Sequence, residues 1–514
     1  MFPALTKSRL IPCALLLFAM HFTPAQTTSK AAANPQRRLL VLYRNGYVPG
    51  DAESATVRAG GHLIQRHDRL GTALVTGNTA TEASLRKSPN VEYVIEDRLV
   101  SASAALTRPV NVPAPGKLRP NPVKVGPIQP IYTPPSPATD TFYNNSPQGW
   151  AVRAVGGFGG NIAGGQQTGP WATTTGSGIR IAILDSGVDR NHPDIAPNLT
   201  LNMTEVDQTA QPSACEDGSP QDQAGHGTWV ASLAAGAAGA STGRTVGVAP
   251  NASILNIKVL QRMPGSGSTT AQQCSNGQAS GLLSWVLQGI DDAIAQRADI
   301  IVLSMSVTLD LYSGDAAGVK ASFDRVTHAA AQAGAIIVAA AGNDALDLSN
   351  ARYVEMPAQA RDVLAVTAST NPACAEGLQT GATCQPGPVT MPYYSNHGAP
   401  LNAVSAPGGS YPMGADEAIS GWVRGACTSG LANTVDGLPT DANHSEGCFN
   451  QGHQLYVQAI GTSASAPLVA GVAALVKAAH PDWSASTVIA AVRASAQPTG
   501  VVDATAAIAY KPQQ

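Results

Sequence analysis

Short apolar runs rich in isoleucine and valine recur along the middle of this chain, and longer helical segments separate them. The helices are expected over residues 281–296 and 316–333. Because each short run is rich in β-branched residues and mostly apolar, it indicates a strand that is covered on both faces. This alternation predicts an α/β fold around a mainly parallel sheet, with functional residues at the carboxyl ends of the strands. The runs span residues 179–184, 254–259, 300–303 and 335–338.

Residues 1–25 have the pattern of a secretory signal peptide. Lys7 and Arg9 precede an apolar stretch, and small residues follow it up to Ala25. We therefore expect cleavage near Ala25 and a secreted protein, either extracellular or periplasmic. No apolar run approaches the roughly 20 residues that a membrane-spanning helix needs, so we expect no membrane span.

The rest of the chain divides into three segments. Residues 33–101 contain strand-like runs around a short helical segment and predict a small α+β unit. Residues 102–139 predict an exposed linker, since ten of the 37 prolines lie between positions 106 and 139 and no acidic residue does. Residues 140–511 hold the alternation of strands and helices and predict one large domain.

The charge of the chain argues against nucleic acid as a partner. The formal net charge is −3 over 514 residues. A nucleic-acid binder needs clustered Lys and Arg to displace counterions from phosphates, and this sequence has no long block of either.

Six cysteines remain once Cys13 is removed with the signal peptide, an even number in a chain bound for an oxidising compartment. We expect three disulfides; six cysteines allow fifteen connectivities, and nearest-neighbour pairing is one of them. A metal site is the alternative, but no Cys-x-x-Cys or Cys/His pair at zinc spacing occurs, so we assign no metal ligand. The nearest-neighbour pairs are Cys215 with Cys274, Cys374 with Cys384, and Cys427 with Cys448.

Two motifs set an acid and a base beside glycines. Asp185 stands at the end of the run 179–184, where a carboxylate is partly desolvated and held rigidly. His226 lies between Gly225 and Gly227 at the start of an apolar helix, and its side chain suits proton transfer near neutrality. Taken alone, Asp185 has the alternative role of a turn former, and His226 that of a surface residue at a helix start.

Two further motifs contribute a hydroxyl and an amide. Ser463 begins an almost wholly apolar helix, where backbone N–H groups and the positive end of the helix dipole suit a developing oxyanion. Asn343 follows the strand-like run 335–338, where its amide N–H can bind the same oxygen. In isolation, Ser463 has the alternative role of a helix N-cap, and Asn343 that of a turn residue.

Together, these motifs in the chain order Asp, His, Asn, Ser resemble those of the subtilisin-like serine proteases. The resemblance extends over about residues 140–510 and implies a three-layer subtilisin-like domain with a mainly parallel central sheet. Three other segments share it, at residues 191–194, 247–250 and 501–504.

The resemblance implies a role for each residue. Ser463 would attack the scissile carbonyl, His226 would take its proton and pass it to the leaving amine, and Asp185 would orient and stabilise the imidazole. Asn343 and the N–H of Ser463 would form the oxyanion hole. It thus implies a serine endopeptidase that acts on proteins or peptides through an acyl-enzyme and needs no cofactor for catalysis.

The resemblance also implies where a substrate binds. A peptide would lie as an added strand along residues 304–307, beside Ser306 and Val307. The side chain that precedes the scissile bond would reach toward residues 340–342, which end at Gly342.

Residues 33–101 resemble the inhibitory propeptide of this family, most clearly over residues 91–97. This implies a unit that assists folding and blocks the site, as an intramolecular inhibitor, until self-cleavage; we expect a monomer. Structural calcium stays open. Asp194 would be one ligand of a common family site, but the loop 239–245 lacks the usual side-chain ligands.

Some residues depart from the family pattern. Trp229 stands where a second histidine is common, Thr308 where many members have glycine, and residues 463–467 are as in the kexin-like branch. Two other functions remain as alternatives, a silent protease-like binding protein and a sedolisin-type acid protease. The intact triad argues against the first, and His226 argues against the second. No His-Glu-x-x-His pattern supports a metallopeptidase.

Overall fold

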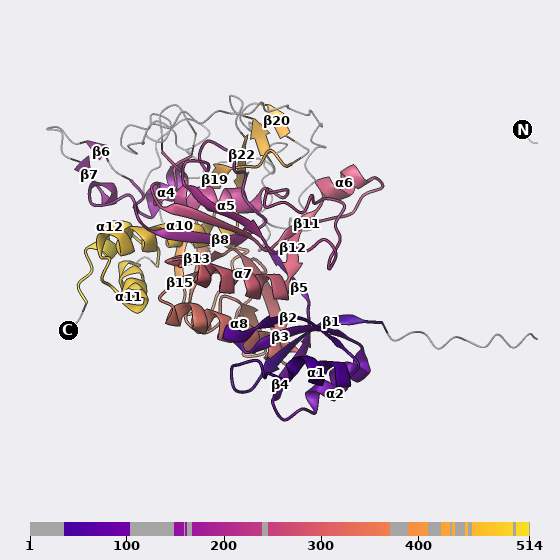
Figure 1. Ribbon diagram of the computed structural model, residues 1–514. Helices are drawn as coiled ribbons and strands as arrows, with labels where there is room; N and C mark the ends of the chain where they lie inside the picture. Colours follow the sequence, from indigo (N-terminus) through magenta and orange to yellow (C-terminus); the bar gives the residue numbers. More distant parts are fainter. Residues whose placement is uncertain are drawn as a thin grey trace, which may run out of the picture.

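The computed structural model contains a small N-terminal unit and a large unit that pack against each other (Figure 1). The predicted signal peptide, at residues 1–25, and nearly all of the predicted linker lie outside the described residues. The structure describes residues 35–102, 149–158, 160–161, 167–238, 245–370, 389–409, 423–431, 434–436, 448–450, 455–496 and 500–512.

A seven-stranded sheet forms the centre of the large unit, in the order β18-β17-β15-β13-β8-β10-β9, and all neighbouring strands are parallel. Along β8, Ile181 and Ile183 belong to the core on one face, and Ala182 and Leu184 to the core on the other. The mostly apolar runs thus reflect burial on both faces, as predicted. The strands are β8 (Arg180–Asp185), β9 (Leu199–Thr204), β10 (Ser253–Lys258), β13 (Ile300–Leu303), β15 (Ile336–Ala340), β17 (Val363–Ser369) and β18 (Val404–Pro407).

Helices cover both faces of this sheet and complete the predicted three-layer α/β architecture. On one face lie α5 (His226–Ala235), α10 (Thr462–Ala479) and α11 (Ala485–Ser495), and on the other lie α7 (Leu283–Ala295) and α8 (Ala316–Gln332). By length and composition α10 is apolar enough to cross a membrane, but 83% of it is buried inside the domain. It is therefore a core helix.

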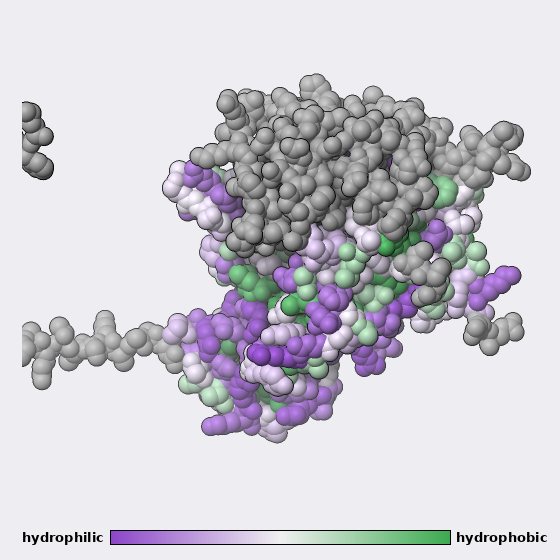
Figure 2. Space-filling view, turned by 180° about the vertical axis from the view of Figure 1, so that it is seen from behind, coloured by the Kyte–Doolittle hydropathy of each residue, from purple (hydrophilic) through white to green (hydrophobic). Residues whose placement is uncertain are grey.

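The N-terminal unit is an antiparallel sheet in the order β2-β3-β1-β4 with two helices on one face. In β1, Leu39 and Val41 pack on the unit's own helices, whereas Leu40 and Leu42 join the core of the large unit. Figure 2 shows the unit as a lobe whose visible surface is mostly hydrophilic. The elements are β1 (Arg37–Tyr43), α1 (Ala52–Arg58), β2 (His62–His67), β3 (Thr72–Gly77), α2 (Thr79–Arg86) and β4 (Val91–Glu96).

A five-stranded sheet joins the two units, in the order β11-β12-β5-β14-β16. Its middle strand, β5 (Leu99–Ala102), continues from the N-terminal unit and pairs antiparallel with a strand of the large unit on each side. The other strands are β11 (Gln261–Met263), β12 (Gln278–Leu282), β14 (Met305–Asp310) and β16 (Tyr353–Met356).

The helix predicted over residues 281–296 begins two residues later than expected. Gly281 and Leu282 belong to β12, and α7 starts at Leu283. The reason is tertiary, because β12 is ordered by pairing with β5, about 180 positions away in the sequence.

Candidate active site

The carboxyl ends of neighbouring parallel strands bring the predicted site residues to one edge of the central sheet. Asp185 is the last residue of β8, Ser304 follows β13, and Asn343 follows β15. His226 and Ser463 lie in the first turns of α5 and α10, which pack against each other over the sheet. Residues that are far apart in the chain thus lie at one edge of the sheet.

Asp185 and His226 form a hydrogen-bonded pair. Nδ1 of His226 lies 2.8 Å from Oδ1 of Asp185, and the Asp185 side chain has no exposed surface. The N–H of Ser186 donates to the same oxygen at 2.7 Å and fixes the carboxylate. Since an ionised carboxylate only accepts, Nδ1 carries the proton and Nε2 is left as the proton acceptor. Nε2 is buried and has no hydrogen-bond partner among the described residues.

The surroundings of His226 favour its charged form. Burial lowers the pKa of the imidazole, but the charge and hydrogen bond of Asp185, with a smaller contribution from Asp222, raise the pKa above its usual value. Trp229 packs edge-on against the imidazole, with 5.9 Å between ring centroids, and its N–H donates to Val423 at 3.2 Å. The residue that departs from the family pattern therefore supports the ring of His226.

Glycine is required beside His226 by the close approach of the turn after β8. A Cβ on Gly227 would lie 2.1 Å from the carbonyl oxygen of Gly187 and 3.1 Å from Cβ of Asp185. Any larger residue would push α5 away from the strand that carries Asp185.

Asp222 holds the start of α5, and the sequence motifs do not single it out. It is fully buried and accepts from the N–H groups of Ala224, Gly225 and Thr228 and from the hydroxyl of Ser186. It replaces the capping side chain that Gly225 lacks. Burial raises its pKa, and hydrogen bonds from Thr228 and the backbone lower it in part. The sequence signal that could have identified Asp222 is an acid shortly before a helix whose N-cap is glycine.

Asn343 and the start of α10 are joined through the Asn343 amide. Its Oδ1 accepts from both the N–H and the hydroxyl of Thr462 at 2.9 Å. These bonds fix the orientation of the amide, and its nitrogen, Nδ2, lies near Gly461. A Cβ atom added to Gly461 would lie 3.3 Å from this Nδ2 and 3.7 Å from the backbone N of Ser463. The amide nitrogen of Asn343 and the backbone N of Ser463 thus lie close to the same point, where the oxyanion hole is predicted.

Ser463 contacts the residue that precedes β14. The Ser304 hydroxyl donates to the carbonyl of Ser463 at 3.1 Å, and Ser463 Oγ lies 3.5 Å from the carbonyl oxygen of Ser304. Both serines are buried. The predicted nucleophile is therefore fixed at the end of the predicted substrate-binding strand.

The edge of β14 that was predicted to bind substrate is paired with the protein's own β5. Ser101 lies opposite Ser306, and Ala102 lies opposite Met305. Val307 follows on the same strand, and its partner on the other edge is Met356 of β16. Gly342, the expected contact of the substrate side chain, has a φ of +96° and lies against Glu355 and Asn396.

One predicted disulfide is present as expected. Cys215 and Cys274 are bonded, with 5.2 Å between their Cα atoms. Cys427 is also disulfide-bonded. Cys374, Cys384 and the side chain of Cys448 lie outside the described residues, so the other two pairings stay predictions.

A sequence model of the Subtilase family, which is a family of peptidases, matches residues 176–508. This match covers more than half of the chain. This chain belongs to the subtilase family. The match begins just before β8 and ends within the last helix, so it contains Asp185, His226, Asn343 and Ser463.

Curated relatives of this subtilase match over part of their length. It is 36% identical over 173 residues to thermitase of Thermoactinomyces vulgaris, which covers 34% of this chain and 50% of thermitase. It is 28% identical over 312 residues to subtilisin E of Bacillus subtilis, which covers 60% of this chain and 58% of that protein. The chain thus spans about half the length of the curated relatives it matches.

Solved structures share the fold of this subtilase. Fervidolysin of Fervidobacterium pennivorans, a keratinolytic enzyme, aligns with a TM-score of 0.60 and 18% identity over 94% of this chain and 63% of its own. The epidermin leader peptide processing serine protease of Staphylococcus aureus aligns with a TM-score of 0.57 and 17% identity over 93% of this chain and 100% of its own. At these identities the likeness concerns the fold alone.

One oxygen of Asp194, the expected calcium ligand, is bound by donors of the protein itself. Its Oδ2 accepts from the hydroxyl of Thr245 at 2.8 Å and from the hydroxyl of Tyr456 at 3.3 Å. These contacts use one of the two carboxylate oxygens, so structural calcium stays a prediction. No three His, Cys, Asp or Glu side chains gather into a candidate metal site in the part of the subtilase that the structure describes.

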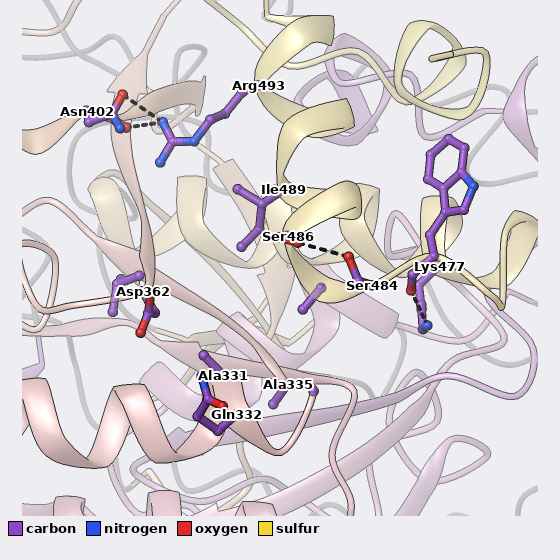
Figure 3. Close-up of a pocket in the computed structure, with 14 residues that line it drawn as sticks. Ala331, Gln332, Ala335, Asp362, Asn402, Lys477, Ser484, Ser486, Ile489 and Arg493 are labelled. Carbon is purple, nitrogen blue, oxygen red and sulfur yellow. Dashed lines mark hydrogen bonds between the residues drawn. The ribbon is translucent and has the colours of Figure 1, made fainter. Parts of the chain in front are cut away.

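A cavity of about 660 Å³ lies away from the triad, between the C-terminal end of α8, the start of β17 and helix α11 (Figure 3). Asp362, Lys477 and Arg493 line it, but both cations already bind backbone carbonyls, Lys477 at Pro481 and Arg493 at Asn402. None of the predicted site residues lines this cavity.

Proposed function

We propose that this subtilase is a serine endopeptidase that hydrolyses peptide bonds of proteins through an acyl-enzyme. The observation that carries the proposal is the 2.8 Å contact between His226 Nδ1 and Asp185 Oδ1. A buried acid orients this imidazole, and helix α5, which carries it, packs against α10, which carries Ser463. An acid, an imidazole and a serine together form the arrangement that activates the serine for acyl transfer. Membership of the subtilase family supports the same reaction.

Each residue has one role in the proposed reaction. Oγ of Ser463 attacks the scissile carbonyl carbon as its proton passes to Nε2 of His226, and Asp185 stabilises the resulting imidazolium. The N–H groups of Asn343 and Ser463 bind the oxyanion. His226 then gives the proton to the leaving amine, and a water molecule repeats these steps on the acyl-enzyme to release the acid and restore Ser463.

The substrate is proposed to replace β5 along β14. Its backbone would pair with Ser306 in the antiparallel register that β5 now adopts and run on along the strand beside Val307. Its side chain before the scissile bond would then lie toward Gly342. No cofactor takes part in these steps.

The N-terminal unit, residues 33–101, is proposed to be an inhibitory propeptide that the enzyme removes from itself. The position of β5 supports this, because this strand covers the substrate edge of β14. We propose that the linker 102–139 is lost in processing and that residues 140–511 persist as a monomeric enzyme.

Secretion, either to the medium or to a periplasm, is proposed from residues 1–25. The bond between Cys215 and Cys274 supports an oxidising destination, since reducing compartments keep thiols free.

Casein hydrolysis by the purified wild type and by Ser463→Ala tests this function. We expect the variant to lose hydrolysis, and a fluorophosphonate to label Ser463 in the wild type only. Hydrolysis that survives Ser463→Ala would overturn the mechanism, and loss of hydrolysis through a chelator alone would indicate a structural or catalytic metal. An optimum confined to acid pH would favour the chemistry of sedolisins instead.

A further inference from the structure

A buried carboxylate with one unsatisfied oxygen lies next to the proposed substrate strand. Glu355 of β16 lies opposite Thr308 of β14 and has no exposed surface. Its Oε2 accepts from the Thr308 hydroxyl at 2.6 Å. Its Oε1 is buried and has no hydrogen-bond partner among the described residues. A buried polar atom that is left unpaired costs about 1–3 kcal/mol, so this oxygen calls for an explanation.

The unsatisfied oxygen points toward the segment that forms the oxyanion hole. A Cβ on Gly342 would lie 3.0 Å from Oε1 of Glu355 and 2.3 Å from Nδ2 of Asn396. That Nδ2 is also buried without a partner among the described residues. Gly342 immediately precedes Asn343, so two unsatisfied polar atoms lie beside the place where the scissile carbonyl is proposed to bind.

The register of β5 identifies which substrate side chain meets them. Ser101 lies opposite Ser306 and Ala102 opposite Met305, so the next residue of a strand in this place lies opposite Ser304. Ser304 contacts Ser463, and the residue opposite it therefore precedes the scissile bond.

Strand geometry places that substrate side chain on the same face as Glu355. Side chains alternate between the faces of a strand, so the residue opposite Ser304 shares a face with Ser306 and Thr308. The hydroxyl of Thr308 is the one that binds Glu355. The substrate side chain and the Glu355 carboxylate thus lie on one side of the five-stranded sheet.

We propose that Glu355 determines the specificity of this subtilase and favours substrates with Lys or Arg immediately before the scissile bond. The inference rests on the proposed endopeptidase function and names its substrate class. A cationic side chain supplies the donors that Oε1 lacks, whereas an acidic side chain would add a second buried negative charge.

The charges around Glu355 make this preference depend on pH. Burial raises the pKa of Glu355 to about 7, the Thr308 and Ser306 hydroxyls lower it in part, and the charge of Asp344 raises it further. No cation among the described residues contributes to this balance. Below about pH 7 the carboxyl is mostly protonated, and above it the carboxylate is ready to pair with a cation.

Two peptides that differ only in arginine or its neutral isostere citrulline before the scissile bond test the proposal. Protonation of His226 affects the cleavage of both peptides equally, so its effect cancels in the ratio of their kcat/KM values. In the wild type we expect the ratio to favour arginine by about 100-fold at pH 8.5. We expect it to fall as the pH drops through about 7.

Two variants complete the experiment. Glu355→Gln keeps the shape and should give a ratio near one at every pH. Glu205→Gln removes another acid whose pKa burial raises, to about 8, but which follows β9 outside the five-stranded sheet, so it should keep the wild-type ratio.

The outcomes separate this inference from the proposed function. If wild-type enzyme cleaves casein and is labelled at Ser463 but its arginine-to-citrulline ratio does not change with pH, the role of Glu355 alone is overturned. This outcome holds even if Glu355→Gln fails to fold. Equal ratios in the wild type and Glu355→Gln would do the same. Absence of both casein cleavage and Ser463 labelling would overturn the endopeptidase function itself.

Discussion

The carboxylate of Asp97, in the N-terminal unit, caps helix α7 at Ser284, which lies 187 residues further along the chain. Its two oxygens accept from the N–H of Ser284 at 2.9 Å and from its hydroxyl at 2.7 Å, and Arg38 donates to it at 3.0 Å. The residue at the N-cap of α7, Leu282, has no capping side chain of its own. The large unit thus relies on the N-terminal unit to satisfy the start of this helix.

Replacing Asp97 should weaken the hold of the proposed propeptide. Asp97→Ala removes a buried cap and ion pair worth about 1–2 kcal/mol, which corresponds to roughly tenfold weaker inhibition. We expect the full-length chain to reach full activity sooner, measured as a shorter lag in casein hydrolysis. Asp51→Ala, in an exposed pair with Arg58 at 3.7 Å, is the matched control and should keep the lag. An unchanged lag in Asp97→Ala would argue against this role.

Activity should rise with pH as His226 loses its proton. Because Asp185 raises the pKa of His226, the midpoint in kcat/KM should lie above the usual value of about 6.5. Asp185→Asn removes that charge, so we expect the midpoint to move to lower pH and kcat to fall by about 10⁴-fold. Stopped assays with a neutral peptide across the pH range measure both. A midpoint that does not respond to Asp185→Asn would contradict the pairing of the two residues.

Asn343→Ala should slow the chemical step with little effect on substrate binding. The amide is proposed to bind the oxyanion and not the ground-state substrate, so we expect kcat to fall by about 100- to 1,000-fold with KM nearly unchanged. Steady-state kinetics with a fluorogenic peptide separate the two constants. Asn276→Ala, which alters an amide on an exposed loop, should leave both constants at wild-type values. A change in KM alone would instead indicate a role in substrate binding.

Lys258→Met should destabilise the enzyme strongly. Lys258 pairs with Glu216, and neither side chain has exposed surface. Removing one partner of a buried ion pair costs about 3–5 kcal/mol, because the other charge stays buried. Urea unfolding at pH 8.5 measures this loss, and adding Glu216→Gln to Lys258→Met should recover part of it. A double variant as unstable as Lys258→Met would show that the charge is not the cause.

The loss in Lys258→Met should also depend on pH. Burial raises the pKa of Glu216 to about 7, well above its usual value of 4.5, even beside Lys258. A group whose folded pKa is raised favours the folded state at low pH, and this contribution is lost as the pH rises through the folded pKa. Lys258 lowers this pKa, so its loss should move the titration of Glu216 above pH 7, and the variant should be more stable at pH 6 than at pH 8.5. Parallel unfolding curves at pH 6 and 8.5 check this.

Local patterns in the sequence determined the central sheet and the residues around it. The runs before Asp185 and Asn343 are almost wholly apolar because both faces of each strand are buried, so they indicate parallel strands on their own. His226 and Ser463 could be identified because each opens an apolar helix, and helix starts have recognisable residues.

Only the tertiary structure decided what lies against that site. The pairing of β5 with β14 uses backbone hydrogen bonds, which any sequence can make, so residues 99–102 carry no sign of their partner. Asp97 and Glu355 look like ordinary surface acids in the sequence and are both buried, because segments distant in the chain close over them. Burial and unsatisfied hydrogen bonds arise from contacts between distant segments, and these contacts give Asp97 and Glu355 the roles proposed for them.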